Sequence, residues 1–328
     1  MSPPAGRAGG ALVVEVEPRS PYRLPARRWP DGVARTRGGV YERFLRIDRK
    51  PVLVRAWELR TEGRVAIAAI PAPPAWVVGG VEETAGSDEL ERAVRAVRHA
   101  LAVDDDMREF HRRFRRDPLI GPLIRRMPWL RARRCARPWE ALAWAVTEQL
   151  IEAERAGTIQ RRIVRRWGDE LRFPEGIRPL RDVPGPEVLA ASSPAELASM
   201  DLAPKRALAL IKVAREVAAG RCDLMSAEDD RRLAAISEIG PWTLQCLGLN
   251  GRGDMDSLPA GDLAYVKLVG HLAGLGRRAT VVEVEEYYRP YAPYRGIVGL
   301  LTLAGLRKAF SGARPLRYHP ASPELEAA

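Results

Sequence analysis

The pattern of apolar residues changes near position 87, and this change constrains the fold more than any other feature of the sequence. Before it, short runs rich in valine and isoleucine lie between prolines, glycines and charged residues, a pattern typical of β-strands. After Ser87 and Asp88, apolar residues recur at helical spacing, and several segments begin with a proline, which the first turn of a helix tolerates. The sequence therefore predicts an α+β protein, with an N-terminal antiparallel β-sheet domain followed by an all-α domain.

The expected elements follow from these two patterns. We expect strands over residues 12–16, 42–47, 51–57 and 65–70. We expect helices over residues 88–102, 107–115, 118–126, 138–167, 186–191, 194–200, 204–219, 227–236, 241–249, 262–272, 281–288 and 295–309. The predicted domains are a β-rich domain with a linking helix over 1–105, a helical domain over 106–320, and a flexible tail over 321–328.

The charge of the chain favours a polyanionic partner. Its 328 residues include 53 Lys and Arg against 42 Asp and Glu, a formal net charge of +11. Eleven arginines lie between Asp106 and Arg137, where only three residues are acidic. Two interpretations of this basic segment remain open, a patch that faces DNA and a solvated helix surface.

Several classes of protein are disfavoured by the remaining composition. Three dispersed cysteines fit neither a disulfide framework nor a thiolate metal site, and the four histidines lack the spacing of a helical metal motif. We expect no metal ion and no other cofactor. The apolar stretch over 296–306 is far shorter than the ~20 residues that span a bilayer, and residues 11–14 are too short for a signal peptide. We therefore expect a cytoplasmic protein that does not contact membranes.

The most informative segment covers residues 231–269. It predicts a helix, a tight hairpin over 237–240, a second helix opened by Pro241, a glycine-rich loop and a third helix after Asp262. Backbone N–H groups at the start of the second helix have no partner within that helix, so they suit a phosphate oxygen. Such a contact does not depend on base sequence.

This segment resembles the helix-hairpin-helix DNA glycosylase superfamily, and most closely the bacterial 3-methyladenine DNA glycosylase II family. The matching residues are IGPWT at 239–243 and LPAGD at 258–262, and 20 residues separate Trp242 from Asp262. Further likenesses extend over most of the chain, at residues 138–151, 202–207 and 289–295 and in the strands that follow residues 20–22.

The resemblance implies that Asp262 is the catalytic carboxylate of a glycosylase that excises damaged, alkylated bases from duplex DNA. Base release gives the sugar oxocarbenium character, and a nearby anion stabilises that sugar or aligns the attacking water. A position directly before a helix also favours the ionised carboxylate. The alternative role for Asp262, a helix N-cap, is compatible with catalysis.

The resemblance also implies how the base and the duplex are held. Trp242 stands where bifunctional members carry a lysine that forms a Schiff base, so we expect no lyase activity; Trp242 is equally consistent with an ordinary core residue. Leu150 corresponds to the residue that probes the duplex and would fill the hole left by a flipped base, although a leucine on a helix is usually core. The expected pocket residues are Trp242, Gln149 and Tyr291, and the expected DNA-binding residues are Leu150, Ser237, Ile239, Gly240, Thr243 and Lys267.

The sequence departs from the family pattern at the hairpin and in the pocket. Glu238 stands where the hairpin usually has its first glycine, Cys246 and Leu263 stand where the family tends to place tyrosines, and Leu300 falls near a tryptophan position. These departures leave two alternatives open, a non-catalytic DNA-binding or damage-sensing protein and an enzyme that acts on deaminated or other modified bases. Under each of these interpretations, we expect a monomer that binds double-stranded DNA in the nucleoid. Asp254 and Asp256 are expected to be solvated turn residues.

Overall fold

The N-terminal region forms a five-stranded antiparallel sheet in the computed structural model, which describes residues 10–26, 29–79, 83–174 and 177–306. The strand order is β1-β5-β4-β3-β2. The four predicted strands are confirmed with shifts of at most two residues at their ends, whereas β2 was missed because its sequence, ARTR, lacks a β-branched run. The strands are β1 (Leu12–Val16), β2 (Ala34–Arg37), β3 (Val40–Ile47), β4 (Lys50–Leu59) and β5 (Arg64–Pro71).

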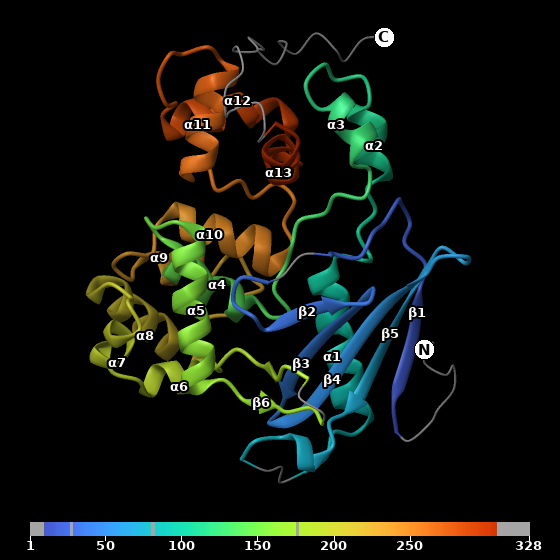
Figure 1. Ribbon diagram of the computed structural model, residues 1–328. Coiled ribbons are helices and arrows are strands. Elements are labelled where there is room, and N and C mark those ends of the chain that lie inside the picture. The colour runs from blue at the N-terminus through green and yellow to red at the C-terminus, as the bar shows by residue number, and fades with distance from the viewer. Residues whose placement is uncertain (1–9, 27–28, 80–82, 175–176, 307–328) are drawn as a thin grey trace.

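Both faces of the sheet are covered, which explains why β4 and β5 carry buried apolar residues on both faces. Val52, Val54 and Ala56 of β4 pack with α1 (Ser87–Leu101), which lies against the sheet in Figure 1. Leu53 points the other way, as period-two alternation requires, and belongs to a separate cluster with Phe44 of β3. That cluster is closed by a short hairpin from the helical region, β6 (Glu170–Leu171) and β7 (Leu180–Arg181).

The rest of the described chain is mainly helical, so the predicted α+β fold is confirmed. The domain limits remain predictions, and the predicted tail over 321–328 lies outside the described residues. The helices after α1 are α2 (Arg108–Phe114), α3 (Gly121–Arg126), α4 (Pro138–Glu148), α5 (Ala153–Trp167), α6 (Pro186–Ala191), α7 (Pro194–Ser199), α8 (Pro204–Ala218), α9 (Asp230–Ala234), α10 (Pro241–Cys246), α11 (Leu263–Leu272), α12 (Val281–Tyr288) and α13 (Arg295–Leu306). Shorter turns are η1 (Pro74–Trp76), η2 (Leu247–Arg252) and η3 (Arg289–Tyr291).

The helices enclose two apolar cores. One core contains Leu142 of α4 and Leu210 of α8, and the other contains Leu268 of α11 and Val298 of α13. The segment that contains η2 passes from the first core to the second, since Leu247 is buried in one and Leu249 in the other. The loop that carries Asp262 continues from this crossing, so the residue lies near the junction of the two cores.

The predicted helix over 138–167 is wrong, because the structure breaks it into α4 and α5. Tertiary hydrogen bonds hold Gln149 on both sides: its carbonyl accepts from the Arg206 guanidinium at 2.6 Å, and its side-chain amide donates to the Glu238 carbonyl at 2.6 Å. Leu150 then takes a left-handed conformation with φ of 56°. The predicted helix over 241–249 likewise ends as α10 at Cys246 and continues as the π-helical turn η2.

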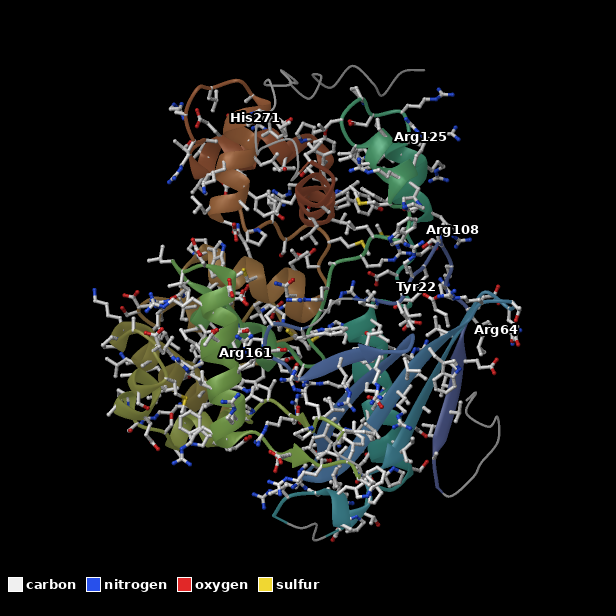
Figure 2. All side chains as sticks on the ribbon, viewed as in Figure 1. Tyr22, Arg64, Arg108, Arg125, Arg161 and His271 are labelled. Carbon is white, nitrogen blue, oxygen red and sulfur yellow. The ribbon has the colours of Figure 1, made fainter. Side chains whose placement is uncertain are left out.

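The basic segment between residues 106 and 137 mainly holds the fold together. In Figure 1, α13 lies between α11 and the pair α2 and α3, and Figure 2 places Arg108 and Arg125 on that outer side, away from the α4–α5 break. Six of its eleven arginines donate to protein groups: Arg108 to Asp106, Arg125 to the Arg115 carbonyl, Arg126 to the Gly305 carbonyl, Arg131 to Ser20, Arg134 to Asp105 and Arg137 to Glu140.

A buried ion network joins the sheet to the helices. The Arg43 side chain on β3, 1% exposed, donates from Nη2 to Glu140 at 2.8 Å and to Asp182 at 3.0 Å. Arg137 donates to the same two carboxylates, at 2.9 Å and 2.5 Å. Asp182 also accepts from the backbone N–H of Arg46 at 2.7 Å, so one carboxylate links β3, the start of α4 and the segment after β7.

Replacing Asp182 should destabilise the protein strongly. Asp182→Ala removes a carboxylate that pairs with two guanidinium groups, one of them fully buried. We expect the free energy of unfolding to fall by about 3–5 kcal/mol. The matched control is Asp169→Ala, because Asp169 pairs with Arg46 at the surface and should cost less than about 1 kcal/mol. Urea denaturation measures both values, and similar losses in the two variants would contradict the role of the network.

Candidate functional site

Asp262 directly precedes α11 and caps it. Its backbone is extended, and its Oδ1 accepts a hydrogen bond from the Ala264 N–H at 2.7 Å. The preceding loop is held by the Asp262 N–H, which donates to the Pro259 carbonyl at 2.9 Å, while Pro259 itself is buried. The N-cap interpretation is therefore correct, and it engages one carboxylate oxygen of a side chain that stays partly exposed.

Trp242 lies beside the loop that carries Asp262. A Cβ atom added to Gly261 would lie 3.8 Å from Cδ1 of the Trp242 indole and 3.9 Å from Val281 at the start of α12. Trp242 is the second residue of α10 and is half-buried. The structure thus brings together the two residues that the sequence motif pairs, from α10 and from the start of α11.

Gln149 and Leu150 form the exposed corner between α4 and α5. Leu150 is 100% exposed, so it is not a core residue, and its contact with the duplex stays a prediction. The Gln149 amide nitrogen donates to the Glu238 carbonyl at 2.6 Å and to the Thr243 hydroxyl at 2.9 Å. Both amide hydrogens are therefore used within the protein. Gln149 positions this corner on the hairpin and has no donor left for a base.

Tyr291 does not line an open pocket. It is 1% exposed and packs against Phe114 and Tyr288, with ring centroids 5.6 Å and 6.3 Å apart. It is therefore part of an apolar core, as expected for an aromatic residue within a helical layer. The aromatic side chain associated with Asp262 is Tyr265, one turn into α11, which is 3% exposed.

Titratable side chains from three elements interact around Asp262. Burial raises the pKa of the Tyr265 phenol, and Asp262 adds to this increase. Burial also raises the pKa of the Cys246 thiol, and Glu148 and Asp262 act in the same direction. Sequence analysis missed Glu148 and Tyr265. One signal for Glu148 was available, because Glu140 and Glu148 are the only charged residues in α4.

A separate cleft lies at the loop before Asp262. Asp254 accepts from the Ser257 hydroxyl at 2.7 Å, as expected of a turn residue. Asp256 departs from that expectation, because it forms an ion pair with Arg295 at 2.5 Å. The carboxylates of Asp254, Asp256 and Glu285, which line this cleft, would repel a phosphate group. The cleft has a volume of about 170 Å³ and is lined by Gln245, Asp254, Asp256, Ser257, Leu258, Glu285 and Arg295.

Within residues 10–306, apart from the three short gaps, no group of three or more His, Cys, Asp or Glu side chains is arranged to hold a metal ion. Across the same part of the chain, no helix has the length and apolar composition needed to cross a membrane.

The hairpin between α9 and α10 combines exposed and buried residues. Ser237 and Glu238 are exposed, and Gly240 is partly exposed. Ile239 is buried in a core, and its N–H donates to the Ile236 carbonyl at 3.0 Å. These placements give a tight turn with a polar outer surface.

Two curated proteins are similar to this chain in sequence. No protein-family model matches the chain. The chain is 24% identical over 211 residues to the DNA-3-methyladenine glycosylase of Bacillus subtilis (strain 168), covering 62% of this chain and 69% of that protein. It is 26% identical over 302 residues to the probable bifunctional transcriptional activator/DNA repair enzyme AlkA of Mycobacterium tuberculosis (strain CDC 1551 / Oshkosh), covering 88% of this chain and 57% of that protein.

The fold agrees with these relatives. The structure of the 3-methyladenine DNA-glycosylase from Archaeoglobus fulgidus superposes with a TM-score of 0.74 at 20% identity, covering 91% of this chain and 99% of that one. The chain is therefore similar in fold and in sequence to helix-hairpin-helix DNA glycosylases. Other solved structures with this fold contain DNA.

Two of the residues predicted to contact DNA at the hairpin have buried side chains. Ile239 faces the core, and Thr243 is 1% exposed, with its hydroxyl bonded to Gln149. Both residues stabilise the hairpin from within. Ser237 and Gly240 remain at the outer turn, and Lys267 is exposed on α11, so their predicted contacts stay open to test.

Glu238 adopts the conformation that favours glycine in a helix-hairpin-helix turn. Its φ is 74°, within the left-handed region, where a Cβ atom is strained. We expect Glu238→Gly to raise the free energy of unfolding by about 1 kcal/mol, after the entropy lost by glycine is subtracted. Glu238→Gln keeps the Cβ atom and removes only the charge, so its stability should equal that of the original protein. Urea denaturation of the three proteins tests this, and equal stability of all three would show that the turn is unstrained.

Proposed function

We propose that this protein is a DNA glycosylase that flips damaged bases, alkylated purines above all, out of duplex DNA and hydrolyses the bond between sugar and base. The product is an abasic site. The observation that carries the proposal is the Asp262 carboxylate, held at the start of α11 by the Ala264 N–H in a loop that contacts Trp242. Two sequence relatives are named as a DNA-3-methyladenine glycosylase and a probable DNA repair enzyme, which supports the same activity.

The chemistry requires a single carboxylate when the base is cationic. As the glycosidic bond lengthens, positive charge develops on the sugar, and Asp262 stabilises that charge and orients water toward C1′. An alkylated purine already carries a positive charge and departs as a neutral molecule. Asp262 is suited to this role because the Ala264 N–H and the start of α11 hold its carboxylate in one orientation.

The exposed corner and the hairpin suit a duplex partner. A flipped base leaves a gap in the stack, and the fully exposed Leu150 side chain has the apolar character to fill it from the minor groove. Because Gln149 ties this corner to the hairpin, the wedge and the phosphate-binding turn would dock as one unit. We propose that a monomer binds double-stranded DNA of the nucleoid in this way.

We further propose that the enzyme has no lyase activity. Trp242 occupies the position at which bifunctional members carry the Schiff-base lysine, and an indole cannot form that adduct. Lys267 is exposed on α11, more than one turn beyond Asp262, and its placement suits contact with a phosphate.

Asp262→Asn tests the catalytic assignment. Asparagine is an equally good N-cap, so the fold and the affinity for duplex DNA should be kept, whereas release of 3-methyladenine and 7-methylguanine from methylated DNA should fall by at least about 100-fold. Asp254→Asn, in the same loop, should retain full activity. Undiminished release by Asp262→Asn contradicts the assignment. If the unmodified protein releases none of 3-methyladenine, 7-methylguanine, hypoxanthine and uracil but binds DNA, it is a damage-sensing protein.

A trapping experiment tests for lyase activity. When the protein is incubated with damaged duplex DNA and borohydride, we expect no covalent protein–DNA adduct on a denaturing gel, because no lysine replaces Trp242. A known bifunctional glycosylase on its own substrate provides the positive control. A strong adduct that persists in Lys267→Ala would show that another amine of this chain acts as nucleophile.

A further inference from the structure

Glu148 is an acidic side chain at the site for which the proposed chemistry has no use. It is the last residue of α4 and directly precedes Gln149. Its Oε1 accepts a hydrogen bond from the Gln160 amide of α5 at 2.9 Å, and the same amide donates to the Thr147 hydroxyl at 3.1 Å. Glu148 is partly exposed, whereas Thr147 and Gln160 are buried. The Gln160 amide thus holds one carboxyl oxygen of a side chain that is partly exposed.

The position of Glu148 relative to Asp262 is set by the packing of α4 on α10. Gln149 bonds to Thr243 of α10, and the Cys246 thiol, one turn further along α10, interacts with both Glu148 and Asp262. The loop that carries Asp262 contacts Trp242, the residue before Thr243 on the same helix. The two carboxyl groups therefore belong to one cluster around Cys246, approached from α4 and from the start of α11.

The surroundings of Glu148 shift the pKa of its carboxyl group in opposite directions. Burial raises the pKa of its carboxyl, and the carboxylates of Asp31 and Asp262 act the same way. The Gln160 hydrogen bond and Arg133, on the segment before α4, act against them without cancelling the increase. A raised pKa means that the protonated form persists to higher pH than for an ordinary glutamate. Such a carboxyl group can donate a proton at higher pH than an ordinary glutamate can.

We propose that Glu148 is a second catalytic residue, an acid that protonates the departing base and so extends the reaction to uncharged damaged purines. This inference rests on the proposed glycosylase function. A neutral purine such as hypoxanthine is a poor leaving group unless a ring nitrogen is protonated as it departs, whereas a cationic purine needs no such proton. Glu148 therefore sets the range of substrates, and Asp262 serves both classes.

Side chains and water supply and accept every proton in this reaction, so no cofactor is needed. The bond from C1′ to the purine nitrogen breaks, its electron pair moves into the base, and the Glu148 carboxyl transfers its proton to a ring nitrogen. Water forms a new bond to C1′ and gives a proton to Asp262. The base leaves neutral, Asp262 returns its proton to solvent, and Glu148 takes one up, which restores both side chains.

The decisive variant is Glu148→Gln, which keeps the shape and the acceptor oxygen for the Gln160 amide but has no proton to donate. Under single turnover, we expect hypoxanthine release from duplex DNA to fall by about 100-fold, with release of cationic 7-methylguanine nearly unchanged. Hypoxanthine release by the unmodified protein should decline as pH rises through the Glu148 pKa, and this decline should vanish in the variant. Glu154→Gln, a surface acid on α5, is the matched control and should behave as the unmodified protein.

Each other outcome overturns the inference in a distinguishable way. Equal losses on both bases would mean that Glu148 only supports the fold of the site, and thermal unfolding would register the same defect. Unchanged hypoxanthine release in Glu148→Gln would exclude it as the acid. Release of 7-methylguanine but not of hypoxanthine by the unmodified protein would refute the proposed substrate range while leaving the glycosylase function intact. Failure on both bases would remove the proposed function itself.

Discussion

The buried ion network around Arg43 is the interaction on which the rest of the structure depends. It fixes the first turn of α4 through Glu140 to β3 of the sheet and to Asp182 after β7. The other end of α4 is fixed through Gln149 to the hairpin. A helix of 11 residues is about 16 Å long, so α4 acts as a rigid connection between the sheet and the site. Because the buried Arg43 and the partly buried Arg137 share two buried carboxylates, a shift of α4 relative to the sheet would leave buried charges without partners.

This connection explains why the sheet matters to chemistry that takes place among helices. The orientation of α4 sets the positions of Glu148, Gln149 and Leu150 at its end. Cys246 and Trp242 lie on α10, which packs against α4. The cluster around Asp262 is thus assembled from elements that are far apart in sequence.

Much of the fold could be predicted from local sequence. Prolines mark the first turn of α4, α8 and α10, and alternating apolar residues mark β3 to β5. The cap role of Asp262 also follows from local sequence, since the proline and glycine before it end one element and open another. These features are determined by residues that are close together in the sequence, so local patterns are enough to predict them.

The remaining features depend on residues that meet only in the folded protein. The break after Glu148 is imposed by Arg206 and by the hairpin, while the sequence from 138 to 167 contains no helix-breaking residue except Gly157. Tyr291 resembled a pocket residue because its sequence context matches the family, yet Phe114 from another segment covers it. The environment of Glu148 comes from Asp31, Arg133, Gln160 and Asp262, and no window of sequence contains all four.

The left-handed backbone at Leu150 has a consequence for the thermodynamics of DNA binding. The conformation, which holds an apolar side chain in water, is already present in the free protein. The backbone strain and the unfavourable hydration of Leu150 therefore reduce the stability of the free protein, and the hydrogen bonds of Gln149 offset them. Insertion into a base stack would not need to order the corner again, and it would release the water around the leucine. Preorganisation of this kind leaves more of the contact energy for opening the duplex.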